Sequence, residues 1–297
     1  MFVMNRIILA LLVTFSLSRL KASEALDSKP SQFSFDCNKF SVFTKKGVPA
    51  IPLRQALYFY SNYKDKYNLN SDRILIADYS LNSSKNRFFI LNLKTDEVIK
   101  MRVSHGSGKL TLYRMDKNGH EEMYVERFNG ESGHNGDFTK CRISDEDLDR
   151  VNLNRKQFGR PPYHNQENLT RAGFFKTGAL YNSYTHHKEN RPPGREYWHN
   201  IKGDFNGIRL FGLTPEANDK AFEHGVVFHE ATYNSPHAPI MGRSYGCPAF
   251  SKGKVKKYLD QFLGGVLYYS YTPQCQEEMT RVEKQIPQFE KFCESYH

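Results

Sequence analysis

The feature that most constrains the fold of this 297-residue chain is a series of short runs rich in β-branched and aromatic residues. Turn-forming residues separate most of these runs, and few stretches carry the apolar spacing of an amphipathic helix. Short strands must pair into a sheet to bury their apolar faces. The runs expected as strands are residues 73–79, 87–93, 97–103, 173–176, 207–211, 226–229 and 266–271. The sequence therefore predicts a mainly β domain with peripheral helices, an α+β fold of the sandwich type.

Helices are expected over residues 53–67, 214–222, 251–262 and 273–287. The first of these segments places apolar residues on one face at helical spacing. The second begins with a Thr-Pro pair, and the third begins with a serine that can cap it and is followed by two glycines. The last lies in the charged tail and ends at a proline.

The chain divides into four predicted parts. These are a signal peptide at 1–25, an arm and helix at 26–72, a main domain at 73–271 with an insertion at about 110–170, and a charged tail at 272–297. The arm at 26–48 is expected to be irregular.

The N-terminal segment has the pattern of a secretory signal. Arg6 precedes an apolar run at 7–17, which is shorter than the ~20 residues of a membrane span, and Ala22 and Ser23 offer cleavage sites. We therefore expect export to the periplasm or cell envelope, with no stable membrane insertion after the signal is removed. A retained N-terminal anchor is the alternative.

The charge balance agrees with an exported protein. Lys and Arg number 42 against 32 Asp and Glu, so the formal net charge is +10. A positive charge favours anionic partners. Nucleic acid is a poor candidate for an exported chain without a Lys/Arg-rich run, whereas an anionic cell envelope fits. A solvated basic surface without a partner is the alternative.

The five cysteines bear on both compartment and chemistry. In an oxidising compartment an even number can pair, which leaves one free. Cys247 is the expected free thiol, because a disulfide there would disable a nucleophile. The other four, Cys37, Cys141, Cys275 and Cys293, allow three connectivities, and the sequence does not choose among them. Reduced cysteines are the alternative.

The motif Gly-Arg-Ser-Tyr-Gly-Cys-Pro at residues 242–248 brings that thiol into a tight turn. Upstream, His229 ends an apolar run and so lies at the end of an expected strand. A thiol is nucleophilic as the thiolate, and a neighbouring imidazole commonly removes its proton. Cys247 and His229 are therefore the candidate nucleophile and base of an enzyme that forms a thioester. The alternatives are a buried structural cysteine and a core histidine.

The residues around the thiol suit a rigid turn. Gly246 allows unusual dihedral angles, and Pro248 keeps Cys247 out of the helical region. The turn can present the backbone N–H groups of Tyr245, Gly246 or Cys247 to an oxyanion. Ser244 can hydrogen-bond within the turn or hold the histidine. Ser244 and Tyr245 can equally be scaffold.

Three side chains are candidate substrate contacts. Arg243 and Tyr245 flank the nucleophile. Arg209 lies on the expected strand at 207–211, and its planar guanidinium can hold a carboxylate. A surface salt bridge is the alternative role of Arg209.

A metal site is the competing interpretation of the same region. His229-Glu230 begins a His-Glu-x-x-His pattern, but Tyr233 occupies the position of the second histidine. The segment also follows a strand rather than lying on a helix. We therefore expect no metal.

The spacing of His229 and Cys247 and the Ser-x-Gly-Cys turn resemble the L,D-transpeptidase catalytic-domain family of bacterial cell-wall enzymes. The resemblance covers roughly residues 53–271, with a poor match from about 110 to 170. Most family members carry an arginine two residues after the cysteine, where this chain has Ala249. The chain therefore looks like a divergent branch, and that arginine's substrate contacts cannot be carried over.

The resemblance implies a peptidoglycan L,D-transpeptidase that needs no cofactor. Cys247 would cleave the L,D bond of a stem peptide and pass the acyl group to an amine through a thioester, and the backbone carbonyl of Glu230 would orient His229. Water or a free D-amino acid as acceptor would give an L,D-carboxypeptidase or an exchange enzyme. From other classes, a catalytically silent cell-wall-binding protein and a secreted cysteine peptidase remain open.

The insertion at 110–170 is polar and carries two Asn-Gly pairs and a possible short helix at 145–158. We expect it to pack on the catalytic domain as a lid that governs substrate choice, because loops on a rigid scaffold usually carry specificity. A passive surface excursion is the alternative.

Overall fold

The structure is a computed structural model that describes residues 37–69, 72–106, 108–127, 138, 141, 144–162 and 168–294. The predicted signal peptide lies outside the described residues, as do residues 26–36 of the predicted arm. None of the helices in the described part of the chain has the length and apolar character that a membrane span requires.

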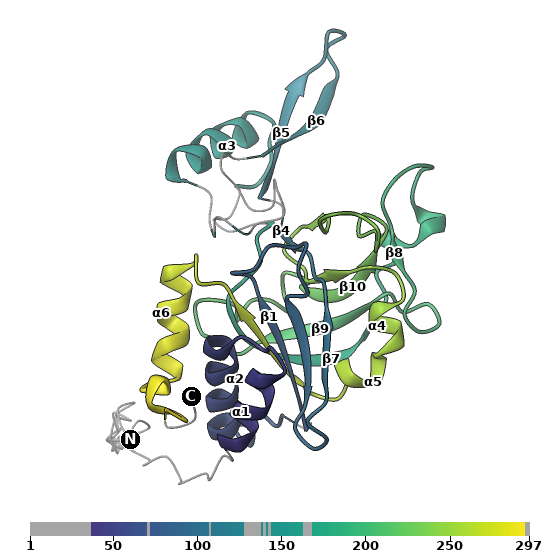
Figure 1. Cartoon of the computed structure of the whole chain (residues 1–297). Helices are drawn as coiled ribbons and strands as arrows, with labels where there is room; N and C mark the ends of the chain where they lie inside the picture. The colour runs from purple at the N-terminus through teal and green to yellow at the C-terminus, as the bar shows by residue number, and fades with distance from the viewer. Residues whose placement is uncertain are drawn as a thin grey trace, which may run out of the picture. The chain divides into compact units, whose positions relative to one another are not determined.

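The centre of the fold is a nine-stranded mixed sheet with the order β12-β10-β9-β7-β13-β1-β2-β3, in which β8 also pairs with β10 (Figure 1). Its strands are β1 (Arg73–Asp78), β2 (Phe88–Asn92), β3 (Val98–Met101), β7 (Gly173–Tyr181), β8 (Trp198–His199), β9 (Gly207–Gly212), β10 (Val227–Ala231), β12 (Ala249–Phe250) and β13 (Leu267–Tyr271). β1 with β13 and β10 with β12 are parallel pairs, and the other pairs are antiparallel. The prediction of a mainly β fold is confirmed.

Two further pairs of strands form separate small sheets. β4 (His105–Gly106) pairs in parallel with β11 (Arg243–Ser244), which leads into the cysteine turn. β5 (Lys109–Met115) and β6 (Glu121–Arg127) form an antiparallel hairpin.

The helices are peripheral, as predicted. They are α1 (Cys37–Lys45), α2 (Ala50–Tyr63), α3 (Asp145–Gln157), α4 (Lys254–Lys257), α5 (Leu259–Phe262) and α6 (Gln276–Gln285), with short 3₁₀ turns η1 (Tyr184–His186), η2 (Lys188–Asn190) and η3 (Phe289–Lys291). α2 packs on β1 and β13, α6 contacts β7, and α4 contacts β10. Aromatic rings fill the space beneath α2, where Phe59 stacks on Phe174 at 3.8 Å between ring centroids.

Two local predictions were wrong. Residues 37–45 of the expected irregular arm form α1, because Phe40 and Phe43 bury one face of a helical turn. Residues 214–225 form successive turns instead of a helix. There the Asn218 side chain bonds the backbone of Thr214, Ala172 and Phe174, which competes with helical bonding.

The insertion at 110–170 has a structure of its own. Helix α3 lies against the β5–β6 hairpin, and a small core joins them. The buried residues of that core are Leu110, Leu112, Val151 and Leu169. The predicted short helix at 145–158 is thus confirmed as α3.

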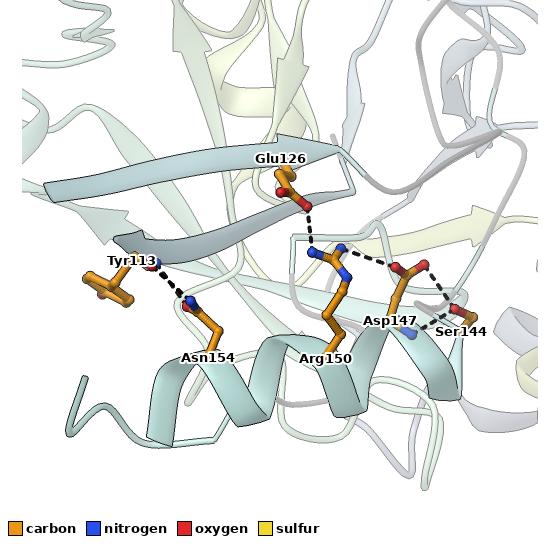
Figure 2. Close-up of polar contacts among 6 residues, drawn as sticks. All are labelled: Tyr113, Glu126, Ser144, Asp147, Arg150 and Asn154. Carbon is orange, nitrogen blue, oxygen red and sulfur yellow. Dashed lines mark hydrogen bonds and ion pairs between the residues drawn. The ribbon is translucent and has the colours of Figure 1, made fainter. Parts of the chain in front are cut away.

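Polar contacts complete the packing of α3 on the hairpin (Figure 2). Ser144 caps the helix by accepting the N–H of Asp147 at 3.1 Å. Arg150 pairs with Glu126 of β6 at 2.8 Å. Asn154 accepts from the Tyr113 N–H and donates to the Tyr113 carbonyl, at 2.9 and 2.8 Å. The insertion is therefore an ordered unit over its described residues.

The cysteines pair as Cys37–Cys293 and Cys141–Cys275, and Cys247 is free. The first bridge ties α1 to the end of the chain, and the second ties the insertion to the start of α6. The prediction that Cys247 is the free thiol is confirmed, and the connectivity that the sequence left open is resolved.

Candidate active site

Pairing between β10 and β12 brings the histidine strand and the cysteine turn together. The two strands are parallel, and His229 lies opposite Ala249, two residues after Cys247. The register therefore places Cys247 beside the start of β10, where its Sγ lies 3.8 Å from the carbonyl oxygen of Gly225. Cys247 and His229 line one cavity of about 490 Å³.

Ser244 closes the turn that carries Cys247. Its hydroxyl accepts the Gly246 N–H at 3.1 Å and donates to the Cys247 carbonyl at 2.6 Å. Gly246 has a φ of +109°, and an added Cβ would lie 2.6 Å from the carbonyl oxygen of Leu169. Both facts require glycine at this position. The turn therefore holds the sulfur in one place.

The hydrogen bond between Ser244 and the Gly246 N–H removes one of the three N–H groups predicted as oxyanion donors. The N–H of Gly246 is used inside the turn by Ser244, so it is not a donor for a substrate oxygen. The N–H groups of Tyr245 and Cys247 stay candidate donors. Tyr245 is 62% exposed and lines the cavity, where its side chain can meet a ligand.

His229 is 1% exposed and is held mainly by rings. The indole of Trp198 stacks on it with 3.8 Å between centroids and 21° between planes. The Tyr233 hydroxyl lies 3.4 Å from its Nε2. Its Nδ1 is buried and makes no hydrogen bond with any described residue. A hydrogen-bond contact with the Glu230 backbone, too poor in geometry to satisfy Nδ1, nevertheless raises the pKa of the imidazole, and the orienting role of the Glu230 carbonyl stays a prediction.

The surroundings keep both reactive groups neutral. Burial, with a smaller contribution from the neighbouring His186, lowers the pKa of His229 to about 3. Burial also raises the pKa of the Cys247 thiol to about 11, against a smaller opposing effect of a hydrogen bond with the backbone of Val227. The resting site therefore holds a thiol and a neutral imidazole rather than a preformed ion pair.

The Glu230 side chain serves the scaffold. Its carboxylate is buried and accepts the N–H of Gly253 at 2.5 Å and the N–H of Lys256 at 2.8 Å. These bonds cap the start of α4 in place of Ser251, which the sequence favoured as the cap. Burial raises the pKa of Glu230, and the backbone bonds oppose that rise.

Of the candidate substrate contacts, the structure gathers Arg243 and Tyr245 around the cavity but not Arg209. The guanidinium of Arg209 lies 3.6 Å from the ring centroid of Tyr181, with Phe222 also nearby at 5.1 Å. Arg209 thus sits on an aromatic surface outside the cavity lining.

The segment between β7 and β9 supplies about half of the cavity wall. The lining residues from this segment are His186, Arg191, Gly194, Arg195, Glu196 and Trp198. The core of the site contributes His229, Tyr233, Arg243, Ser244, Tyr245 and Cys247, and β6 of the insertion contributes Met123. Three arginines against one glutamate give the cavity a positive balance.

Sequence reasoning missed Arg191, Arg195, Glu196, Tyr233 and Met123 as cavity residues. The dense run of His, Arg and aromatic residues between residues 182 and 199 was the available signal. The exposed Met123, 64% accessible in the middle of a polar strand, was a weaker one.

A mixed sheet that brings a histidine strand and a cysteine turn to one cavity is the arrangement expected of a thiol-dependent acyl-transfer enzyme. The chain matches the family described as L,D-transpeptidase catalytic domain over residues 44–133 and 200–271, more than half of its length. It belongs to that family. No significant match was found among the curated proteins or among the solved structures.

The residue ranges of the family match correct the predicted extent of the poorly matched segment. We predicted a poor match over 110–170, but the matched region continues to residue 133 and includes the β5–β6 hairpin. The unmatched segment is 134–199, which contains α3, β7 and the cavity residues between β7 and β9. Family membership supports a transpeptidase-type function related to peptidoglycan, and the two disulfides are compatible with export.

Proposed function

We propose that the protein is a peptidoglycan L,D-transpeptidase in which Cys247 is the nucleophile and His229 is the general base. The observation that carries the proposal is that the free cysteine shares one cavity with a buried histidine, while the four other cysteines are paired in disulfides. The family supports the reaction type and the class of substrate.

The first half-reaction forms a thioester. The Cys247 sulfur attacks the carbonyl carbon of the third stem residue as His229 takes the thiol proton, because the resting pair is neutral and no thiolate is stored. The N–H groups of Cys247 and Tyr245 are the candidate donors to the developing oxyanion. Collapse of the tetrahedral intermediate breaks the L,D bond, and the imidazolium returns its proton to the departing D-amino acid.

The second half-reaction resolves the thioester. An amine of a second stem peptide attacks the acyl carbon, His229 removes a proton from that amine, and the Cys247 thiol is regenerated. Water in place of the amine gives L,D-carboxypeptidase activity, and a free D-amino acid gives exchange. The positive lining of the cavity fits stem peptides, which carry carboxylates.

The insertion supports a role in acceptor choice. Met123 on the β5–β6 hairpin lines the cavity, so the insertion takes part in the binding surface. We infer that exchanging Met123 for Ser changes the preference among acceptors while the thiol keeps its reactivity toward an acylating reagent. An unchanged product distribution would make the hairpin a passive element.

The test is incubation of the protein with defined muropeptides followed by mass spectrometry of products and of the intact protein. We expect a cross-linked product and an acyl adduct on wild type, and neither on Cys247→Ala. His229→Gln should lose ~10²–10⁴-fold in turnover as a general base is removed. An adduct on Cys247→Ala would end the nucleophile assignment, and binding without turnover by wild type would favour a silent wall-binding protein.

A further inference from the structure

Three rings form a continuous stack at the edge of the cavity. The His229 imidazole lies on one face of Trp198 at 3.8 Å, and the His186 imidazole lies on the other face at 4.0 Å. The interplanar angles are 21° and 15°, so the three rings are nearly parallel. Trp198 is the only tryptophan of the chain.

The ring stack adds to weak polar contacts in orienting His229. The backbone of Glu230 makes a hydrogen-bond contact with the imidazole that is too poor in geometry to satisfy Nδ1, and the Tyr233 hydroxyl lies 3.4 Å from Nε2. An imidazole without firm hydrogen bonds can rotate about its Cβ–Cγ bond unless packing stops it. The Trp198 indole covers a whole face of the ring and supplies that restraint.

Trp198 is itself held from two directions. Its backbone belongs to β8, which pairs with β10 so that Trp198 lies opposite Ala231. Its outer face is covered by His186, whose Nδ1 lies 2.6 Å from the Ser183 hydroxyl. The segment that carries these groups, residues 182–199, lies outside the region matched to the family.

We propose that Trp198 is a positioning residue for the transfer reaction: its indole fixes the plane of the His229 imidazole and stabilises the imidazolium that forms when Cys247 gives up its proton. This inference rests on the proposed function. An aromatic face attracts a cation placed over it, and tryptophan does so best. The attraction is larger where water is excluded, and His229 is almost fully buried.

His186 suits the outer position because it stays neutral. Burial, with a smaller contribution from the nearby Arg191 guanidinium, lowers the pKa of His186 to about 4. A second cation on the opposite face of Trp198 would compete for the same ring and repel the His229 imidazolium. A neutral His186 imidazole covers the indole and neither competes for the ring nor repels the His229 imidazolium.

The first arm of the test compares wild type with Trp198→Leu and Trp198→Phe. Trp198→Leu should lower kcat by about 10- to 30-fold with KM nearly unchanged, since the lost attraction acts on the charged form in the transition state. Trp198→Phe keeps a smaller ring and should lose less than about tenfold. Phe222→Leu is the matched control, because it removes one ring of the Phe211–Phe222 stack outside the cavity lining.

The second arm needs no substrate. The single indole gives one Nε1–H resonance, and His229 is assigned by comparison with His229→Gln. The His229 ring protons should lie upfield through the ring current of the stacked indole and show contacts to it. Trp198→Leu should return these resonances to ordinary positions while the control Phe222→Leu leaves them unchanged.

Two outcomes would overturn the inference. One is a Trp198→Leu variant that folds and keeps the wild-type kcat. The other is a His229 resonance that does not respond to loss of the indole. If instead wild type fails to process muropeptides, the proposed function fails, and the resonance arm still decides whether Trp198 fixes the imidazole.

Discussion

The protonation state of the resting site is open to a direct measurement. Iodoacetamide alkylates thiolates, and Cys247 is the free cysteine beside two disulfides. With a thiol pKa of about 11, roughly one Cys247 in 10⁴ is ionised at pH 7. Burial lowers the pKa of His229 to about 3, so the imidazole is neutral at the same pH and a thiolate–imidazolium pair is disfavoured in the resting site.

The alkylation rate should therefore rise about tenfold for each pH unit from pH 6 to pH 9, without a plateau. Intact-mass spectrometry of samples quenched over time gives the rate at each pH. Cys247→Ala is the control and should take up no label. His229→Gln should be alkylated at nearly the wild-type rate although its turnover is lost, because the imidazole acts only once substrate is bound.

The reasoning would be refuted by a plateau between pH 5 and pH 8, which is the profile of a thiolate–imidazolium pair. A more than tenfold slower alkylation of His229→Gln would refute it as well, since it would mean that the histidine already ionises the thiol in the resting protein.

Three further outcomes follow from buried groups and cross-links. Burial raises the pKa of Glu278 from 4.5 to about 7, so the folded state holds the carboxyl proton more tightly than the unfolded state. The free energy of unfolding should therefore fall by about 3 kcal/mol as the pH rises from 4.5 to 7. Glu278→Gln should remove this pH dependence in urea titrations. Glu230→Ala leaves two half-buried N–H groups without their carboxylate acceptor and should cost about 1–3 kcal/mol by thermal unfolding, whereas Glu230→Gln should cost less and keep turnover per folded molecule. Replacing both Cys141 and Cys275 by Ser should lower the free energy of unfolding by up to about 5 kcal/mol, because the disulfide closes a loop with a sequence separation of 134 residues. An unchanged urea midpoint would contradict this.

The parts of the site that could be predicted are those that depend on residues close together in the sequence. The apolar run before His229 predicts a strand, and the small residues around Cys247 predict a turn. The strand prediction was wrong in one detail, because β10 continues to Ala231 and His229 lies within the strand rather than at its end. The register of β10 with β12 brings His229 and Cys247 to one cavity. The strands of the main sheet were predictable for the same reason, because alternating and β-branched runs depend on neighbours in the chain.

The parts that could not be predicted depend on distant contacts. Arg191 and Arg195 look like ordinary loop residues until the fold brings their segment to the cavity, and the stacking of Trp198 on His229 depends on the pairing of β8 with β10. The turns at 214–225 replace a helix because the Asn218 side chain reaches backbone groups on β7 and before it. The sequence around residues 214–225 gives no indication of these hydrogen bonds to Ala172 and Phe174.

The order of the cysteines along the chain has a consequence for biosynthesis. The Cys141–Cys275 bridge is nested within Cys37–Cys293, so both native partners are synthesised after Cys247. Any disulfide that forms before residue 275 is available is non-native, and two of the three possible non-native pairs include Cys247. A chain that has formed such a pair reaches the native pairing only by thiol–disulfide exchange. Where pairing begins that early, recovery of a free Cys247 thiol requires disulfide isomerisation as well as oxidation.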